Sequence, residues 1–179
     1  MMGTGKSTVG RLLSQELGYR FFDTDAVIEQ AAGQSVSELF ASHGEATFRQ
    51  LETQVLAELS AYTDLIIATG GGIVLKRDNW SYLHQGIVVW LDVPVQELHK
   101  RLQQDCTRPL LQAKQAGGPT KELAEEFAEE LLERLQILLT ERRQLYSQAD
   151  LRVSFVAGET PEQAASRILE TLPQVLKPV

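Results

Sequence analysis

Apolar residues along the chain fall either into short continuous runs or into longer segments where they recur every three or four positions. Runs of the first kind are typical of strands buried in a parallel sheet, and the second pattern is typical of helices that cover such a sheet. Leu65 to Ala68 is the clearest strand, and the segment after residue 119 is the clearest helix. We expect further strands at 19–22, 87–91 and 151–155, and further helices at 6–17, 45–60, 78–84, 94–102 and 161–172, with short helices ending near 33 and beginning after 35.

This alternation of strands and helices predicts an α/β fold with a largely parallel sheet. A chain of 179 residues suits one domain, and an apolar content of 43% is ordinary for a globular core. Residues 103–119 lack periodicity and contain Gly117 and Gly118, which predicts a loop. We therefore expect a single domain over residues 1–179, a three-layer sandwich with a central parallel sheet between helices and a mobile segment in its middle.

The composition limits the possible partners. The formal net charge of −7 argues against sequence-independent binding of nucleic acid. No apolar run approaches the roughly 20 residues of a membrane-spanning helix, and no signal peptide is visible. The single cysteine, Cys106, excludes an internal disulfide framework and fits a reducing compartment. We expect a cytoplasmic monomer with small-molecule ligands, and neither nucleic acid nor membrane as a partner.

Residues 3–8, Gly-Thr-Gly-Lys-Ser-Thr, match the end of the phosphate-loop pattern G-x-x-x-x-G-K-[ST]. Its glycines let backbone N–H groups face phosphate oxygens, while Lys6 reaches the β- and γ-phosphates and Ser7 ligates Mg²⁺. The opening glycine of the pattern and the apolar strand before it are not in the sequence, so we expect a truncated or mis-started chain. A flexible glycine-rich N-terminus is the alternative, which the amphipathic run directly after Lys6 disfavours.

Asp23 and Asp25 follow the predicted strand 19–22, at the kind of strand end where α/β proteins place ligands. In an extended chain both project to the same side, which suits one carboxylate for Mg²⁺ and one for an acceptor hydroxyl. The spacing equally allows a turn residue at Asp23 and a helix N-cap at Asp25. Asp92 also ends an apolar run, but Pro94 and a helix follow at once, so capping explains it at least as well and we leave it outside the site.

Gly70, Gly71 and Gly72, here called the glycine turn, follow the apolar run 65–68. Three residues without side chains let a ligand approach the backbone closely. A tight turn between a strand and a helix is the alternative, but such a turn rarely needs three glycines. We favour a backbone surface that lies under a ligand.

Any anionic ligand of this acidic chain needs a local cluster of cations, which directs attention to Arg49, Arg101, Arg108 and Arg142. The planar fork of arginine makes bidentate contacts with carboxylates and phosphates. Arg108 lies in the loop 103–119, where closure could deliver it to a transferring phosphate. Spacing alone leaves the alternatives open: a solvated loop residue at Arg108, and at Arg49 a surface ion pair with Glu52.

Together these motifs resemble the shikimate kinases. The resemblance runs over nearly the whole chain, and the ordered set is far more specific than a phosphate loop alone. It is carried by Gly3-Thr4-Gly5-Lys6-Ser7-Thr8, Phe22-Asp23-Thr24-Asp25, Phe48-Arg49 with Glu52, Gly70-Gly71-Gly72, Arg108-Pro109-Leu110-Leu111, and Arg142 four residues before Tyr146.

The resemblance implies a P-loop NTPase-like fold with a mobile lid over about 103–135, and ATP-dependent phosphorylation of the 3-hydroxyl of shikimate in aromatic amino acid biosynthesis. The cofactors implied are ATP and Mg²⁺, with Ser7 and Asp23 at the metal, Asp23 through water. The nucleotide residues implied are Gly3, Thr4, Gly5, Lys6, Ser7, Thr8, Arg101, Arg108 and Pro161.

For the acceptor, the resemblance implies that Asp25 binds the shikimate hydroxyls and orients or deprotonates the attacking one. Arg49 and Arg142 would clamp the shikimate carboxylate, and the backbone of the glycine turn would line the site. Lys6, Asp25 and Arg108 would be the catalytic residues. The segment 112–134 is longer than expected of the family, so we expect altered lid dynamics with the same reaction.

Two other functions remain open at this point. One is a gluconate-type or other small-metabolite kinase on the same phosphate-loop scaffold. We rank it below a shikimate kinase, because Asp25, Arg49, the glycine turn and Arg142 together indicate a cyclic acceptor with a carboxylate. The other is a kinase-like protein that binds ligands without catalysis. The presence of Lys6, Asp25 and Arg108 argues against it.

We predict that Arg108→Ala lowers kcat far more than it lowers ATP affinity, because a charge-stabilising residue on a closing loop acts mainly in the transition state. Steady-state kinetics with ATP and shikimate varied in turn would check this. Equal losses in nucleotide binding and turnover would contradict the role.

Overall fold

The computed structural model describes residues 1–104 and 121–176. Cys106, Arg108 and most of the predicted loop lie outside the described residues. The segment 103–135, predicted as a lid, is therefore described only at its two ends, which belong to helices α5 and α7.

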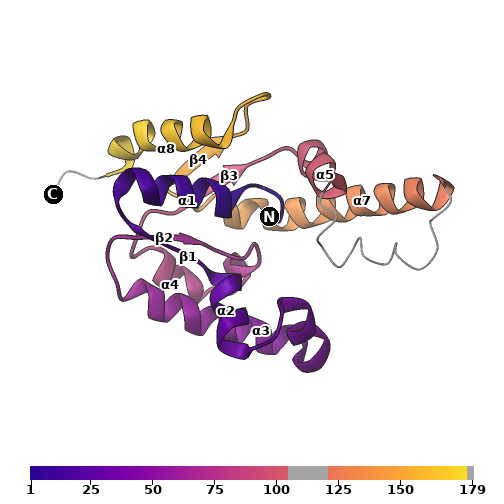
Figure 1. Cartoon of the computed structure of the whole chain (residues 1–179), viewed down its shortest axis with the longest axis horizontal. Coiled ribbons are helices and arrows are strands. Elements are labelled where there is room, and N and C mark those ends of the chain that lie inside the picture. Colours follow the sequence, from indigo (N-terminus) through magenta and orange to yellow (C-terminus); the bar gives the residue numbers. More distant parts are fainter. Residues whose placement is uncertain (105–120, 177–179) are drawn as a thin grey trace.

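The described elements alternate between helices and strands, which confirms the predicted α/β class (Figure 1). The helices are α1 (Lys6–Leu17), α2 (Thr24–Ala32), α3 (Val36–Ser60), α4 (Asn79–Leu83), α5 (Val95–Gln104), α7 (Lys121–Tyr146) and α8 (Pro161–Val175), with a 3-10 turn η1 (Ile73–Leu75). The strands are β1 (Arg20–Asp23), β2 (Leu65–Ala68), β3 (Val89–Asp92) and β4 (Leu151–Ser154).

Local sequence signals set the ends of several helices. Gly18 adopts a left-handed conformation, with φ of 68°, and ends α1 where predicted. Ser35 and Glu38 form the expected capping box at the start of α3. Gly44, with φ of 77° and ψ of 169°, interrupts α3 and separates the two helices that the sequence predicts there.

The strands form two parallel pairs. β1 pairs with β2, so that Asp23 lies opposite Ala68, and β3 pairs with β4. The predicted parallel arrangement is confirmed, but the hydrogen bonds group the described strands into two sheets rather than one. A cavity of about 70 Å³ is bordered by residues near both pairs, among them Thr69 and Val89.

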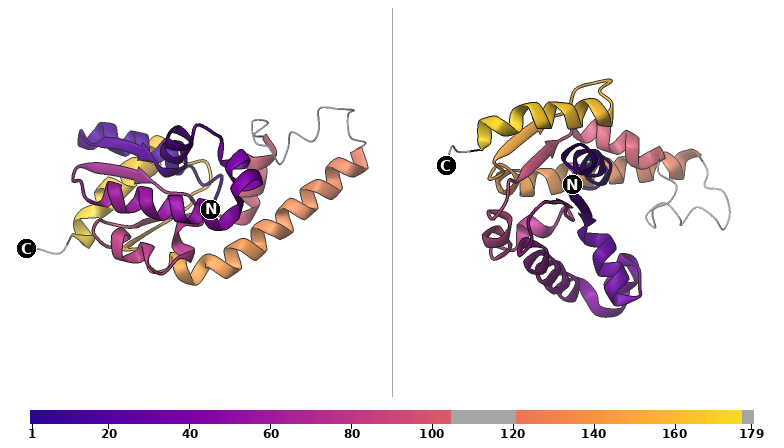
Figure 2. Two further views of the ribbon diagram at one scale, coloured as in Figure 1. Left: turned by 90° about the horizontal axis from the view of Figure 1, so that it is seen from below. Right: turned by 60° about the vertical axis from the view of Figure 1, so that its left-hand side comes forward.

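Helices cover both faces of the strands (Figures 1 and 2). On one face Val9 and Leu13 of α1 pack with the apolar residues of β4 and α8. On the other face α3 supplies Phe48, Val55 and Leu59, which pack against α2 and the outer side chains of β1 and β2. This layering brings the carboxyl ends of β1 and β2 beside the start of α1, and thereby places the site.

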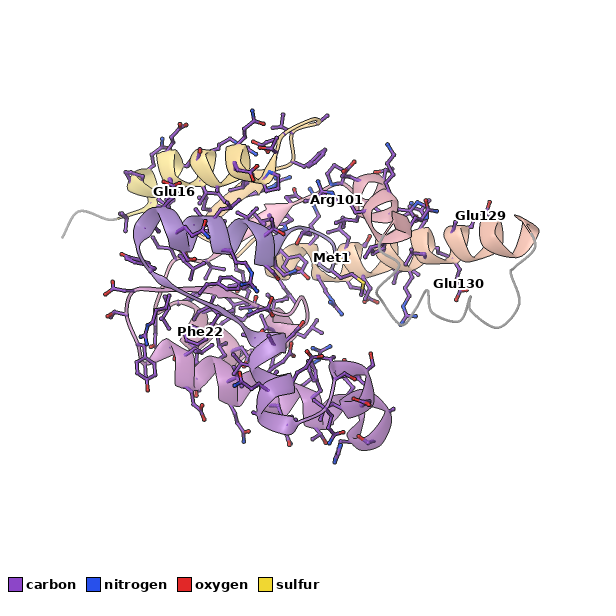
Figure 3. The ribbon with its side chains drawn as sticks, viewed as in Figure 1. Met1, Glu16, Phe22, Arg101, Glu129 and Glu130 are labelled. Atoms are coloured by element: carbon purple, nitrogen blue, oxygen red, sulfur yellow. The ribbon has the colours of Figure 1, made fainter. Side chains whose placement is uncertain are left out.

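From residue 128 onward, where its side chains are described, the long helix α7 is apolar on one side and acidic on the other, as predicted. Leu135 is 1% exposed and belongs to the central cluster of apolar side chains, whereas Glu129 and Glu130 are exposed. Figure 3 shows Glu129 and Glu130 on the part of α7 that extends away from the rest of the chain. Within the described ranges, no helix has the length and apolar character that crossing a membrane requires.

Gly10 fixes how closely α1 approaches β1, and we predict that Gly10→Ala destabilises the protein. A Cβ there would lie 2.8 Å from the Phe21 ring. Overpacking should lower the free energy of unfolding by about 1–2 kcal/mol, net of the helix propensity that alanine adds. Denaturant titration would measure it.

Gly86→Ala is the matched control, because a Cβ at Gly86 meets nothing within 4 Å. It should change the free energy of unfolding by less than about 0.5 kcal/mol. A Gly10→Ala protein as stable as this control would contradict the packing argument.

Candidate active site

The phosphate loop leads into the end of α1 nearest the centre of the molecule (Figure 1). Gly3 and Gly5 have φ values of 73° and 87°, a backbone region that favours glycine, and they curl the chain into α1. Lys6 Nζ donates hydrogen bonds to the Met1 carbonyl at 2.6 Å and to Thr4 Oγ1 at 3.4 Å. The ammonium group is therefore held against the loop.

Ser7 and Asp23 join the loop to the end of β1. Ser7 Oγ donates to Asp23 Oδ2 at 2.5 Å, and Asp23 Oδ1 accepts from the Asp25 backbone N–H at 3.1 Å. Asp23 is thus the N-cap of α2 as well as a neighbour of the loop, while Asp25 lies in the first helical turn, so the alternative that made Asp25 the cap is wrong. A hydroxyl and a carboxylate this close fit Mg²⁺, which binds few protein oxygens and keeps water and phosphate as its other ligands.

Asp25 and Glu52 direct carboxylate oxygens at the same point above Gly70. A Cβ on Gly70 would lie 2.5 Å from Glu52 Oε1 and 2.8 Å from Asp25 Oδ1. Both oxygens are buried and have no hydrogen-bond partner among the described residues. Burial raises the pKa of the Asp25 carboxyl, and the charge of Asp23 raises it further. This is the environment in which a carboxylate acts as a base or accepts a substrate hydroxyl.

Arg49 is held beside this acidic pair. Its Nη1 donates to Glu52 Oε2 at 2.5 Å, and its Nη2 donates to Glu45 Oε1 at 2.9 Å. Glu52 is only 1% exposed, so the ion pair that sequence spacing would place at a surface is buried at its acidic end. Burial raises the pKa of Glu52 despite the opposing effect of Arg49. The guanidinium also fills the space that a Cβ on Gly72 would need.

The glycine turn is held from two sides. The Gly70 N–H donates to Thr24 Oγ1 at 3.0 Å, and Thr24 is fully buried. The Gly71 carbonyl accepts from the Tyr146 hydroxyl at 2.8 Å and from Arg142 Nη1 at 3.2 Å. Sequence reasoning assigned no role to Thr24 or Tyr146. The available signals were the position of Thr24 between two aspartates and the one-turn spacing of Tyr146 from Arg142.

Arg101 projects from α5 toward the phosphate loop (Figure 3). Its Nη1 donates to the Gly3 carbonyl at 3.4 Å, and its Nε donates to Glu97 Oε1 at 3.0 Å. The guanidinium also lies 5.2 Å from the centre of the Phe155 ring. These contacts place Arg101 beside the loop, and its nucleotide-binding role stays a prediction.

The other predicted residues are not drawn together by described contacts. Thr8 is exposed in the first turn of α1, and Pro161 is the first residue of α8. Arg108 lies outside the described residues, so its role stays a prediction. Asp92, which we left outside the site on sequence grounds, accepts a hydrogen bond from Arg152 Nε at 2.8 Å on the neighbouring strand.

Known proteins resemble this chain over nearly its full length. The family model described as Shikimate kinase matches residues 2–173. The chain belongs to the shikimate kinase family. Among curated members, the shikimate kinase of Trichormus variabilis is 55% identical over 99% of this chain and 90% of its own length. The Synechococcus elongatus shikimate kinase is 51% identical over 99% of this chain and 85% of its own length.

Solved structures of shikimate kinases have the same fold. The Acinetobacter baumannii shikimate kinase, solved in complex with shikimate, has a TM-score of 0.81 and 35% identity, covering 98% of this chain and 91% of the other. The Bacteroides thetaiotaomicron shikimate kinase has a TM-score of 0.82 and 30% identity, covering 97% and 94%. The family and the fold expected from the sequence motifs are both confirmed.

Asp25→Asn should separate stability from activity in this shikimate kinase. The pKa of Asp25 is raised in the folded protein, which means that the fold favours the protonated carboxyl over the ionised one. The free energy of unfolding therefore falls as pH rises through the folded pKa and this carboxyl ionises. Asparagine does not ionise. The variant should therefore be more stable than the parent at pH 7 to 8, and the difference should shrink as pH falls toward about 4. Its kcat/KM should fall by about 10²–10⁴-fold.

Denaturant titrations from pH 4 to 8 and steady-state kinetics measure the two effects. Asp78→Asn, at an exposed position before α4, is the control and should alter neither. An Asp25→Asn protein that is less stable than the parent throughout this range would contradict the cause assigned to the pKa shift.

Proposed function

We propose that the chain transfers the γ-phosphoryl group of ATP to the 3-hydroxyl of shikimate, giving 3-phosphoshikimate and ADP on the route to aromatic amino acids. The main support for the proposal is that a phosphate loop, the buried carboxylates of Asp25 and Glu52, and two arginines lie close together around the glycine turn. Shikimate offers a carboxylate for the arginines and hydroxyls for the acids, so its two kinds of polar group match the two kinds of side chain.

Lys6, Ser7 and Asp23 would hold the nucleotide phosphates and their metal ion. The backbone N–H groups of the loop and the start of α1 favour anionic phosphate oxygens. Ser7 and Asp23 would hold Mg²⁺, Asp23 through water, and Mg²⁺ would neutralise charge on the β- and γ-phosphates. Arg101 would lie against the adenine, with Pro161 on the other side of the base.

Asp25, Arg49 and Arg142 would bind the acceptor. The Asp25 carboxylate would accept a hydrogen bond from the attacking hydroxyl and take its proton as the new P–O bond forms. Arg49 and Arg142 would clamp the shikimate carboxylate and so fix which hydroxyl faces the γ-phosphate. The backbone of the glycine turn would lie beneath the ring.

Catalysis on this proposal comes mainly from positioning and charge neutralisation. Phosphoryl transfer asks little covalent chemistry of the protein, and alignment of the two substrates lowers the barrier. Arg108, on the predicted lid, would neutralise charge on the transferring group. Closure of that lid over both substrates would keep water from taking the phosphoryl group. A cytoplasmic monomer is the form we propose for the working enzyme.

ADP release in the presence of Mg-ATP tests the reaction, with shikimate, gluconate and no acceptor compared. We expect release that depends on shikimate, is absent with gluconate, and is lost on chelation of Mg²⁺. Lys6→Ala should lower kcat/KM by about 10²-fold or more, because it removes a cation from the transferring phosphate.

Lys76→Ala provides a matched change of charge outside the site, since Lys76 Nζ bonds Thr53. Its kinetics should match those of the parent protein. Release with gluconate alone would overturn the substrate assignment. Shikimate binding without any ADP release would instead favour a kinase-like binding protein.

A further inference from the structure

Among the described residues, the Gly71 carbonyl has two side-chain hydrogen-bond donors, and both come from one turn of α7. Tyr146 Oη lies 2.8 Å from this oxygen, and Arg142 Nη1 lies 3.2 Å from it. Only one of these donors carries a charge. A buried backbone carbonyl needs one hydrogen-bond donor whether or not a ligand is bound, but it does not need two.

Tyr146 is the more firmly fixed of the two donors. It is 7% exposed, and its ring stacks on Trp90 with the ring centres 5.9 Å apart. Its hydroxyl also accepts a hydrogen bond from the Met1 nitrogen at 3.3 Å. Burial raises the pKa of this hydroxyl, so it keeps its proton and remains a donor throughout the neutral range.

Arg142 is held less completely. Its Nε is buried and has no partner among the residues that the structure describes. The longer of the two bonds to Gly71 is its own. A guanidinium with an unsatisfied buried N–H gains by turning toward a carboxylate, which offers two acceptor oxygens in the geometry of its fork.

We propose that Tyr146 is a positioning residue for the acceptor carboxylate. Its hydroxyl keeps the Gly71 carbonyl satisfied, so that Arg142 can turn its guanidinium from that carbonyl to the carboxylate of shikimate. Without the hydroxyl, Arg142 would be the remaining side-chain donor to Gly71 among the described residues, and the substrate would have to compete with the Gly71 carbonyl for it. The inference rests on the proposed function, because that function brings a carboxylate to Arg142.

Tyr146→Phe tests this, because phenylalanine keeps the ring that packs on Trp90 and removes only the hydroxyl. We expect the KM for shikimate to rise about three- to tenfold, as for loss of one hydrogen bond, with kcat and the KM for ATP little changed. The methyl ester of shikimate lacks the carboxylate charge. With the ester as acceptor, the variant and the parent should have the same kcat/KM within about twofold.

Arg142→Ala supplies a second test that does not depend on turnover of the ester. In that background Tyr146→Phe should no longer weaken shikimate binding, measured by calorimetry, because the side chain that the hydroxyl releases is gone. Tyr62→Phe is the control, since Tyr62 is 63% exposed and precedes the opposite end of β2 from the glycine turn. Thermal melts establish that each variant is folded.

Each outcome decides the inference. A similar loss with shikimate and with its ester, or a loss that persists in the Arg142→Ala background, would mean that Tyr146 only supports the turn, and would overturn the proposal. Unchanged shikimate kinetics in Tyr146→Phe would overturn it as well, while leaving the proposed function intact. If the parent protein itself neither binds nor phosphorylates shikimate, the proposed function fails first and takes this inference with it.

Discussion

The site depends on the bare backbone of the glycine turn. The carboxylates of Asp25 and Glu52 lie where a side chain on Gly70 would stand, and the Arg49 guanidinium occupies the corresponding space at Gly72. Any side chain in these places would push charged groups away from one another. The register of β1 on β2 then delivers the turn and the acidic residues to the same edge of a sheet, so strand pairing and site geometry are a single constraint.

Holding charged groups in this way opposes stability. Buried polar atoms without partners are rare in proteins, yet three of them, on Asp25, Glu52 and Arg142, gather around the turn in the described part of the chain. These atoms, and the raised pKa of Asp25 and of Glu52, identify a region that lowers the stability of the fold. Such regions are expected at functional sites. The apolar layers on both faces of the strands supply the stability that this region lacks.

Local chemistry made much of the fold predictable. The bounds of α1 follow from Gly5 and Gly18, and β2 follows from a wholly apolar run between polar residues. Lys6 and Ser7 could be found because a phosphate loop has a fixed spacing. The separation of the strands into two pairs could not be read from the sequence, because a strand's own residues do not determine its neighbours. The contact of Tyr146 with the Gly71 carbonyl was missed for a similar reason, because the two residues are far apart in the chain.

The cavity bordered by residues of both strand pairs affects how ligand binding responds to temperature. About 70 Å³ of space, partly open to the surface, is bordered by Trp80, Trp90, Gly70 and Gly71. Water reaches apolar surface in such a space, and a ligand that covers that surface gives a negative change in heat capacity. The enthalpy of binding at the glycine turn should then become more favourable as temperature rises.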